Sequence, residues 1–147
     1  MTEKREVTVR LRQLDGYRFE VDWGLPSNEK GVLDEAPPTS SGKGPNPSRL
    51  VAAAVAQCLS SSLLFCIEKS RGKCEGMETS AAVLMERNER GRWRISRITV
   101  TLDPKVPAEF RDNLERCKGI FEDYCIATES VRKGIDVKVE WGPVPTA

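Results

Sequence analysis

Residues 44–70 read GPNPSRLVAAAVAQCLSSSLLFCIEKS, and this stretch decides the fold. Asn46 can cap a helix, and Pro47 suits the first helical position, where its missing N–H costs no hydrogen bond. The alanines that follow favour helix strongly, and Gly72 stands where the helix should end. Because apolar or small residues occupy most of its circumference, we expect a central helix over residues 47–70 that is buried on most sides, by sheet or by a second subunit.

Two alternating runs precede this helix. Apolar residues alternate with polar ones at Val7, Val9 and Leu11, and again at Tyr17, Phe19, Val21 and Trp23. The dipeptide Asp15-Gly16 between the runs tolerates positive φ, so the pattern predicts a β-hairpin. Residues 24–47 are rich in Pro, Gly and Ser, which predicts a long irregular loop.

The second half of the chain alternates strands and short helices. We expect strands over residues 77–87 and 92–102 joined by a turn at 88–91, a helix over 107–118, a short segment at 120–124, a helix over 125–133 that Gly134 ends, and a closing strand marked by Ile135, Val137, Val139 and Trp141. The order ββ-α-ββ-α-α-β predicts one α+β domain over residues 1–147, with antiparallel sheets wrapped around the central helix.

Composition narrows the function classes. The chain of 147 residues has 23 basic and 22 acidic side chains, so its charge gives no reason to expect nucleic acid or an anionic membrane as a partner. From its charged and then alternating N-terminal residues we expect no secretory signal. The apolar stretch 50–67 is interrupted by Gln57 and by serines at 60–62, and we take it as too polar to span a membrane. We therefore expect a cytoplasmic protein whose thiols are kept reduced.

Cysteine and histidine counts limit the chemistry. Five cysteines without a CxxC pair suggest neither a disulfide framework nor a zinc ribbon. Histidine is absent, which excludes Ser-His-Asp and Cys-His machinery and histidine-ligated metals. We expect no cofactor and no metal, and a nucleophile in this chain needs another means of activation.

The cysteines differ in their surroundings. Cys58 lies in the middle of the central helix, where a cysteine is more often a small packing residue than a reactive one. Cys66 and Cys117 are likewise expected to be packing residues. Cys74 lies in a charged turn, where we expect it to be exposed and without a role. Cys125 stands where the last helix begins, so free backbone N–H groups can stabilise a thiolate and lower its pKa.

Three segments carry a resemblance to a known family. GPNPSRLVAAAVAQC (residues 44–58) resembles the central segment of the OsmC/Ohr family, the osmotically induced and organic-hydroperoxide-resistance proteins. YCIATESVRKGIDVKVEW (residues 124–141) is similar to the family's second cysteine, short helix and terminal strand. The loop DEAPP (residues 34–38) also looks like the family, so the resemblance to its OsmC-like branch covers essentially the whole chain.

The resemblance implies a thiol-dependent peroxidase for oxidative stress defence. Cys58 would attack an organic hydroperoxide or hydrogen peroxide and become a sulfenic acid, and Cys125 would then form a disulfide with it. An external dithiol or thiol protein would reduce that disulfide by exchange. The family also implies an intertwined homodimer with its active sites at the interface. A second copy would cover the apolar helix.

The sequence departs from the family at the activating group. In the hydroperoxide-resistance branch an arginine activates the cysteine, and the carboxylate that holds it lies ten residues before that cysteine. Here that position is Ser48, and a hydroxyl does not hold a guanidinium as a carboxylate does. Arg18 is the candidate arginine, with Arg49 as another cation. Glu35, or Asp34, could replace the carboxylate, although a strand arginine and loop carboxylates are more often simply solvated.

Two other functions stay open at this point. One is a binding or redox-sensing protein of the same fold without efficient peroxidase activity, which Ser48 favours and the two cysteine contexts oppose. The other is a structural interaction module, which only the implied dimer supports. For a peroxidase, Leu59, Leu63 and Phe65 are candidates to line a pocket that prefers organic hydroperoxides.

Overall fold

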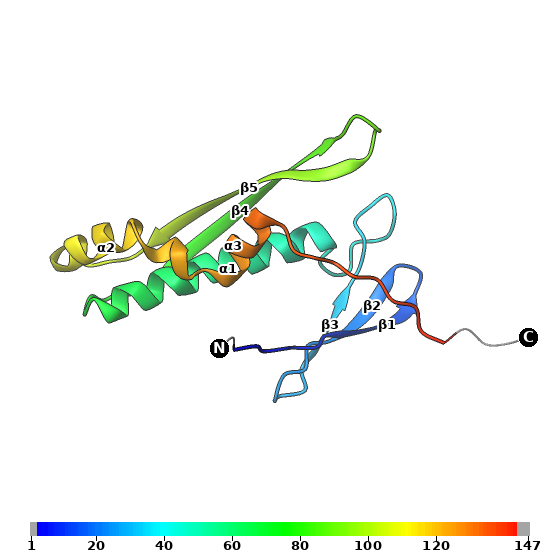
Figure 1. The fold of residues 1–147 in the computed structure, drawn as a ribbon, viewed down its shortest axis with the longest axis horizontal. Helices are drawn as coiled ribbons and strands as arrows, with labels where there is room; N and C mark the ends of the chain where they lie inside the picture. The colour runs from blue at the N-terminus through cyan, green and yellow to red at the C-terminus, as the bar shows by residue number, and fades with distance from the viewer. Residues whose placement is uncertain (1–2, 144–147) are drawn as a thin grey trace, which may run out of the picture. The chain divides into compact units, whose positions relative to one another are not determined.

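The computed structural model of the protein describes residues 3–143 (Figure 1). In chain order its elements are β1 (Arg10–Asp15), β2 (Arg18–Asp22), β3 (Lys30–Leu33), α1 (Pro47–Lys69), β4 (Met77–Arg87), β5 (Trp93–Pro104), α2 (Arg111–Lys118) and α3 (Ile126–Lys133), with 3-10 turns at Ala108–Phe110 and Phe121–Tyr124. This is the α+β fold with a long helix that the sequence predicts. The first of its two compact units holds the described residues through Ala53 and Ala81–Thr99, and the second holds Ala54–Ser80 and those from Val100 onward.

A three-stranded antiparallel sheet forms the base of the first unit. Its order is β1-β2-β3, with Leu11 opposite Val21 and Phe19 opposite Leu33. Gly16 has a φ of +46° in the turn of the predicted hairpin. The expectation that residues 24–47 hold no strand is wrong, because β3 pairs with β2 there. The four residues of β3 are too few to show an alternation of apolar and polar side chains, and Pro, Gly and Ser residues surround them. They form a strand only because they pair with β2.

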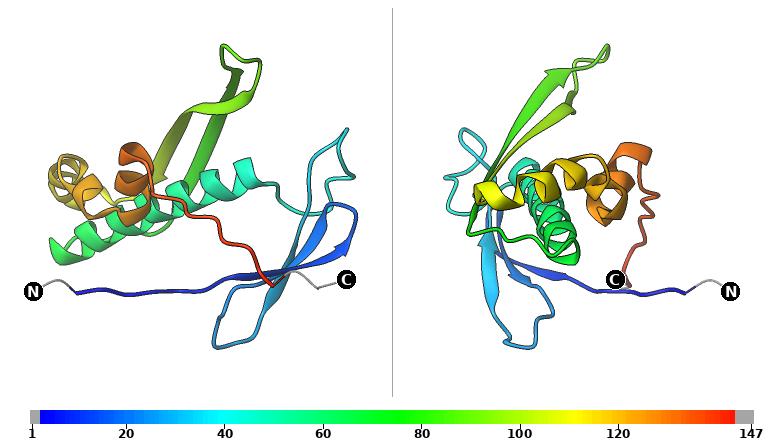
Figure 2. Two further views of the ribbon diagram at one scale, coloured as in Figure 1. Left: turned by 45° about the vertical axis from the view of Figure 1, so that its right-hand side comes forward. Right: turned by 90° about the vertical axis from the view of Figure 1, so that its left-hand side faces the viewer.

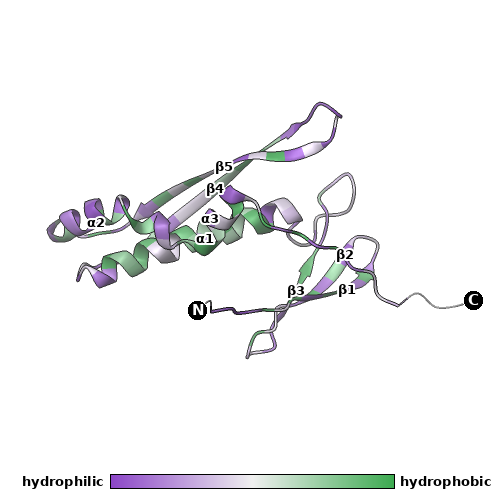
Figure 3. Cartoon of the chain, in the orientation of Figure 1, coloured by the Kyte–Doolittle hydropathy of each residue, from purple (hydrophilic) through white to green (hydrophobic). Residues whose placement is uncertain are grey.

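The helix α1 begins and ends close to the predicted residues. The Asn46 side-chain oxygen accepts a hydrogen bond from the Arg49 backbone N–H at 3.1 Å, which caps the first turn. A buried stripe then follows the i+3, i+4 rhythm, and it consists of Ala52, Val55, Leu59, Ser62, Leu63 and Ile67. Figure 3 shows apolar residues along much of the helix.

The face of α1 away from this stripe is exposed, including Ala54, Gln57, Leu64 and Phe65. Within a single chain the helix is therefore buried only along this stripe, and its cover by a second subunit stays a prediction.

By length and composition alone, α1 could cross a membrane. Its most apolar window has a mean hydropathy of 2.1, and 39% of that window is buried within the protein. The expectation that this stretch is too polar to span a membrane is wrong, because its Ala, Val and Leu residues raise the mean hydropathy more than Gln57 and the serines lower it. The core helix of a soluble protein passes the same test, so this is weak evidence for a membrane span.

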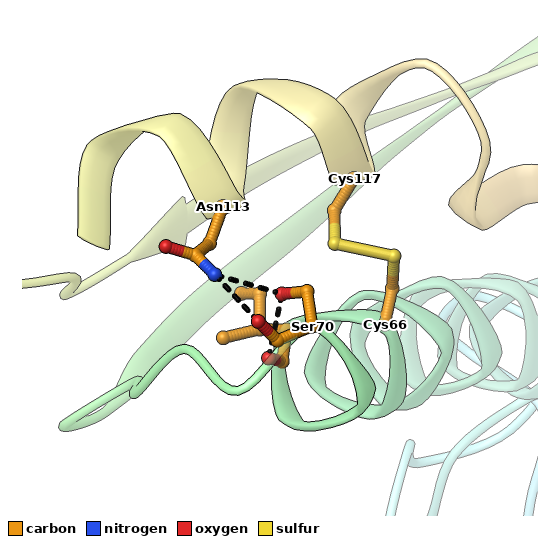
Figure 4. Close-up of a disulfide and its surroundings, with 5 residues drawn as sticks. Cys66, Ser70, Asn113 and Cys117 are labelled. Carbon is orange, nitrogen blue, oxygen red and sulfur yellow. Dashed lines mark hydrogen bonds between the residues drawn. A yellow bond between two sulfur atoms is a disulfide. The ribbon is translucent and has the colours of Figure 1, made fainter.

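In the second unit, α2 is attached to the end of α1 (Figure 4). The Asn113 side-chain amide donates to the Ser70 carbonyl at 2.7 Å and lies 3.2 Å from the Ser70 hydroxyl. Nearby, Cys66 and Cys117 form a disulfide with their Cα atoms 5.8 Å apart. Closing a loop across a sequence separation of 51 residues stabilises the fold by about 4 kcal/mol through the entropy of the unfolded chain.

This disulfide corrects the expectation drawn from cysteine spacing. The odd number of cysteines and the absence of a CxxC motif are features of the local sequence. Cys66 and Cys117, in contrast, are far apart in sequence and meet only because α2 packs against α1. Cys117 is also a core residue, as predicted, with 1% of its surface exposed. Cys74 is half-buried rather than exposed, and its thiol donates to the Gly76 carbonyl at 3.0 Å.

The predicted closing strand is not formed. Residues 134–143 have no strand, and the alternating side chains of Ile135, Val137, Val139 and Trp141 are 63%, 79%, 75% and 90% exposed. At the other end β1 starts only at Arg10, leaving Val7 90% exposed. Both segments run without regular structure in the views of Figure 2. A strand needs a neighbour for its N–H and C=O groups, and within the described residues neither segment is paired in a sheet.

Candidate functional site

Cys58 and Cys125 meet in the second unit. Cys58 lies on α1 and is half-buried, Cys125 directly precedes α3 and is 1% exposed, and both are free thiols. The Cys125 thiol donates a hydrogen bond to the Thr128 hydroxyl at 2.8 Å. Thr128 and Ser62 are themselves buried, so a thiol pair and two hydroxyl groups share one desolvated site.

The surroundings of Cys125 favour its thiolate. Burial by itself would raise the pKa of this thiol, but hydrogen bonding from Cys58, Thr128 and Ser62 outweighs burial and lowers the pKa below its ordinary value. The Thr128 backbone N–H at the start of α3 acts in the same direction. The lowered pKa expected from a cysteine at a helix start agrees in direction, although the side-chain hydrogen bonds contribute more to it than the backbone N–H at the helix start does.

Cys58 has the opposite balance. Burial raises its pKa most, the hydrogen bond with Cys125 raises it further, and the backbone N–H groups of Ala127 and Thr128 only partly offset both effects. None of these influences comes from a cation. The two thiols therefore interact directly, and the first negative charge of the pair resides on Cys125.

Arg18, the candidate activating arginine, lies in the first unit and is held by Asp15. Its guanidinium makes two hydrogen bonds to that carboxylate, at 3.0 and 2.6 Å. The hydrogen bond with Asp15 raises the pKa of Arg18, and the same bond lowers the pKa of Asp15. The carboxylate that orients Arg18 is thus Asp15, three residues away across the hairpin turn, and not Glu35 or Asp34 as the sequence suggests.

Asp34 organises its own loop instead. Only 3% of it is exposed, and its two carboxylate oxygens accept the backbone N–H groups of Glu35 at 2.8 Å and Lys43 at 2.9 Å. Hydrogen bonds from the Ser40 hydroxyl and the Lys43 N–H lower the pKa of Asp34. Both oxygens are therefore already used within the segment that leads to α1.

Glu35 lines a small cavity in the first unit. The cavity has a volume of about 190 Å³, and its other lining residues are Leu11, Tyr17, Phe19, Leu33, Asp34, Pro45, Pro47 and Leu50. The residues predicted to line a pocket lie elsewhere. Leu59 and Leu63 are in the buried stripe of α1, and Phe65 is 53% exposed with the Lys69 ammonium 5.4 Å from its ring centre.

Ser48 and Arg49, next to the helix start, make local contacts. The Ser48 hydroxyl lies 3.4 Å from the Met85 sulfur. Arg49 is exposed, and its guanidinium lies 3.5 Å from the Asn46 side-chain oxygen. Among the hydrogen bonds of the described residues, neither side chain binds a carboxylate or a thiol.

Sequence reasoning missed Thr128 and Ser62 as parts of the site. A signal existed for Thr128, because a residue three positions after a helix N-cap is where cap side chains usually find a partner. Ser62 lies one helical turn after Cys58, so it faces the same side of α1. The serines of α1 are individually unremarkable in sequence, and only the packing of α3 singles out Ser62.

Comparisons with known proteins agree with this fold. The family model described as OsmC-like protein matches residues 40–140. No curated protein matches the chain in sequence. An OsmC-like protein of unknown function from Vibrio cholerae has a similar structure, with a TM-score of 0.70 and 14% identity over 86% of this chain and 94% of its own.

Two further solved structures also have a similar fold. An OsmC-like protein from Mycoplasma pneumoniae has a TM-score of 0.72 and 11% identity, over 88% of this chain and 89% of its own. The organic hydroperoxide resistance protein OhrB of Bacillus subtilis has a TM-score of 0.64 and 21% identity, over 92% of this chain and 97% of its own. At these identities the likeness concerns the fold alone.

Proposed function

Because the chain belongs to the OsmC-like family, we propose that it is a thiol-dependent peroxidase that reduces organic hydroperoxides or hydrogen peroxide through Cys58 and Cys125. The observation that carries this proposal is the direct interaction of these two thiols at the start of α3, where one of them is favoured as a thiolate. Some structural relatives are named organic hydroperoxide resistance proteins. Defence against oxidative stress is the corresponding role.

The proposed reaction uses the pair as its own acid and base. The Cys125 thiolate accepts the proton of Cys58, and the Cys58 thiolate then attacks one peroxide oxygen, so that the O–O bond breaks. The leaving alkoxide takes the proton that Cys125 holds and departs as the alcohol, or as water from hydrogen peroxide, so that Cys58 becomes a sulfenic acid and Cys125 is again a thiolate. The Cys125 thiolate next attacks the Cys58 sulfur, the S–O bond of the sulfenic acid breaks, and the hydroxide takes a proton from solvent and leaves as water as the disulfide forms.

An external dithiol completes the cycle. It reduces the Cys58–Cys125 disulfide by two successive exchange steps and leaves as its own disulfide. The cycle needs no cofactor. Arg18 stays the candidate activating cation of this proposal, with Asp15 in place of Glu35 as the carboxylate that orients its guanidinium.

We also propose that the active form is a homodimer. The exposed alternating side chains of residues 135–141 and the exposed face of α1 are apolar surfaces that a second copy would cover. A cytoplasmic location remains part of the proposal, although the Cys66–Cys117 disulfide is a bond that a reducing compartment does not favour.

The test is a peroxide titration of reduced protein with cumene hydroperoxide and hydrogen peroxide in parallel, followed by mapping of thiols by mass spectrometry. We expect a Cys58–Cys125 disulfide within seconds and turnover when a dithiol is supplied. Cys58→Ser should abolish turnover, Cys125→Ser should leave a sulfenic acid that a dimedone probe traps on Cys58, and Cys74→Ser is the matched control. Unchanged peroxide consumption in Cys58→Ser would sink the proposal.

The raised pKa of Cys58 favours a second candidate function, a binding or redox-sensing protein of the same fold. A thiol that lacks a cation among its main influences reacts slowly with peroxide. Under this alternative the disulfide forms only over many minutes and once per chain, and a dithiol supports no sustained consumption of peroxide. The same titration separates the two functions.

A further inference from the structure

We infer that the Cys66–Cys117 disulfide holds Cys125 in place against Cys58, which makes Cys66 and Cys117 positioning residues of the thiol pair. The inference rests on the proposed function only in taking Cys58 and Cys125 as the reactive pair. It gives a task to two cysteines that the proposed reaction does not use.

Two cysteine pairs join the same two segments of the second unit. Cys58 and Cys66 are eight residues apart on α1, which is about 12 Å along a helix. Cys117 and Cys125 are also eight residues apart, and they meet α1 in the reverse order. The segment from 117 to 125 is therefore fixed covalently to α1 at one end, and it presents the Cys125 thiol to α1 at the other.

The segment between these two ends is stiff. Successive tight turns are closed by backbone hydrogen bonds from Ile120 to Cys117 at 3.0 Å, from Asp123 to Ile120 at 3.2 Å and from Cys125 to Glu122 at 3.1 Å. Phe121, in the middle, is 8% exposed. A displacement at Cys117 is thus passed on to Cys125 rather than absorbed by a flexible loop.

The Cys125 end depends on accurate placement. The Thr128 hydroxyl lies 2.8 Å from the Cys125 sulfur, and the Ser62 hydroxyl of α1 and the Cys58 thiol also lower the pKa of Cys125. Ser62 and Cys58 belong to α1, whereas Thr128 belongs to α3. Any movement of the 117–125 segment away from α1 therefore removes two of these three partners together.

Asn113 offers a noncovalent attachment of the same region to α1 (Figure 4). Asn113, which makes these hydrogen bonds to Ser70, lies one helical turn before Cys117 and is therefore farther from Cys125 along the chain. Asn113→Ala is therefore a matched variant, because it weakens the docking of α2 while it leaves the disulfide in place.

The experiment measures the effective concentration of the Cys58–Cys125 disulfide in glutathione redox buffers, which requires no peroxide. The variants are Cys66→Ala/Cys117→Ala, the volume-restoring Cys66→Val/Cys117→Ala, Asn113→Ala and the control Cys74→Ala. Circular dichroism selects the variants that fold. We expect the effective concentration to fall by about tenfold or more in the double variants, and to stay within about twofold of the wild-type value in the other two. Alkylation of Cys125 should also need higher pH in the double variants.

Three results would overturn the inference: an unchanged effective concentration in a folded double variant, an equal loss in Asn113→Ala, or peptide mapping that finds Cys66 and Cys117 unlinked in protein purified without reductant. Failure of the proposed function looks different. A wild-type chain that forms the Cys58–Cys125 disulfide in glutathione but consumes no peroxide would refute the peroxidase and leave the positioning role intact.

Discussion

At the scale of single residues, the charge of Cys125 depends on Thr128. Thr128→Val removes the hydroxyl while it keeps the shape of the side chain. A hydrogen bond to a charged group contributes roughly 1.5 kcal/mol or more, so the pKa of Cys125 should rise and its alkylation near neutral pH should slow by about tenfold. The measurement is the pH dependence of iodoacetamide labelling, read by mass spectrometry. Thr128→Ser keeps the hydroxyl, and an equal slowing in that variant would contradict the prediction.

Asp34 gives a prediction for stability against pH. Its hydrogen bonds lower its pKa in the folded protein, so they stabilise the fold fully above the unfolded value of about 4. This stabilisation is lost as the pH falls through the lower folded value. Asp34→Asn should therefore lower the urea midpoint at neutral pH, and the difference from wild type should disappear in strong acid. Glu35→Gln, which alters the neighbouring carboxylate, is the control. A difference that does not depend on pH would refute this account.

At the scale of elements, the start of α1 depends on one cap. Asn46→Ala removes the acceptor of the Arg49 N–H, and it should lower the free energy of unfolding by about 1 kcal/mol. Asn46→Ser and Asn46→Asp keep an acceptor and should lose much less. Urea unfolding followed by circular dichroism measures the difference, and equal losses in all three variants would show that the cap contributes nothing.

Elements with local signals were predictable, and those that depend on distant partners were not. The helix α1 has a cap, a proline and a run of alanines, and α3 ends at Gly134, whose φ is +78°. In contrast, β3 exists because β2 lies beside it, and residues 135–141 alternate as a strand without finding a neighbour among the described residues. The spacing of apolar residues and the capping residues indicate which secondary structure a segment can form. For a strand, the presence of a neighbouring strand decides whether that structure is formed.

The candidate site divides in the same way. Resemblance to a family selected Cys58 and Cys125, and the helix start predicted the direction of the pKa shift of Cys125, whereas the side-chain hydrogen bonds that contribute most to lowering it were not predicted. The carboxylate on Arg18 was sought in a distant loop, although Asp15 lies just across the hairpin turn. The Cys66–Cys117 bond spans a separation of 51 residues, and nothing in the spacing of those two cysteines indicates it.

At the scale of the whole molecule, the exposed residues 135–141 predict association. Ile135, Val137 and Val139 lie on one side of the alternation, and Asp136, Lys138 and Glu140 lie on the other. We expect analytical ultracentrifugation to give the mass of two chains. Val137→Asp should shift the protein toward the mass of one chain, whereas Lys138→Glu, on the polar side, should not. A wild-type protein that sediments as a single chain at high concentration would refute the dimer.

The Cys66–Cys117 bond also determines what a protease leaves behind. Arg90 lies in the exposed turn between β4 and β5, inside the stretch that the disulfide closes. A single tryptic cut there should yield one band on a gel without reductant and two bands with it. The fragment before the cut carries Cys58 and the fragment after it carries Cys125. The nicked protein would therefore be a two-chain molecule whose chains each hold one thiol of the pair, joined through the bond between Cys66 and Cys117.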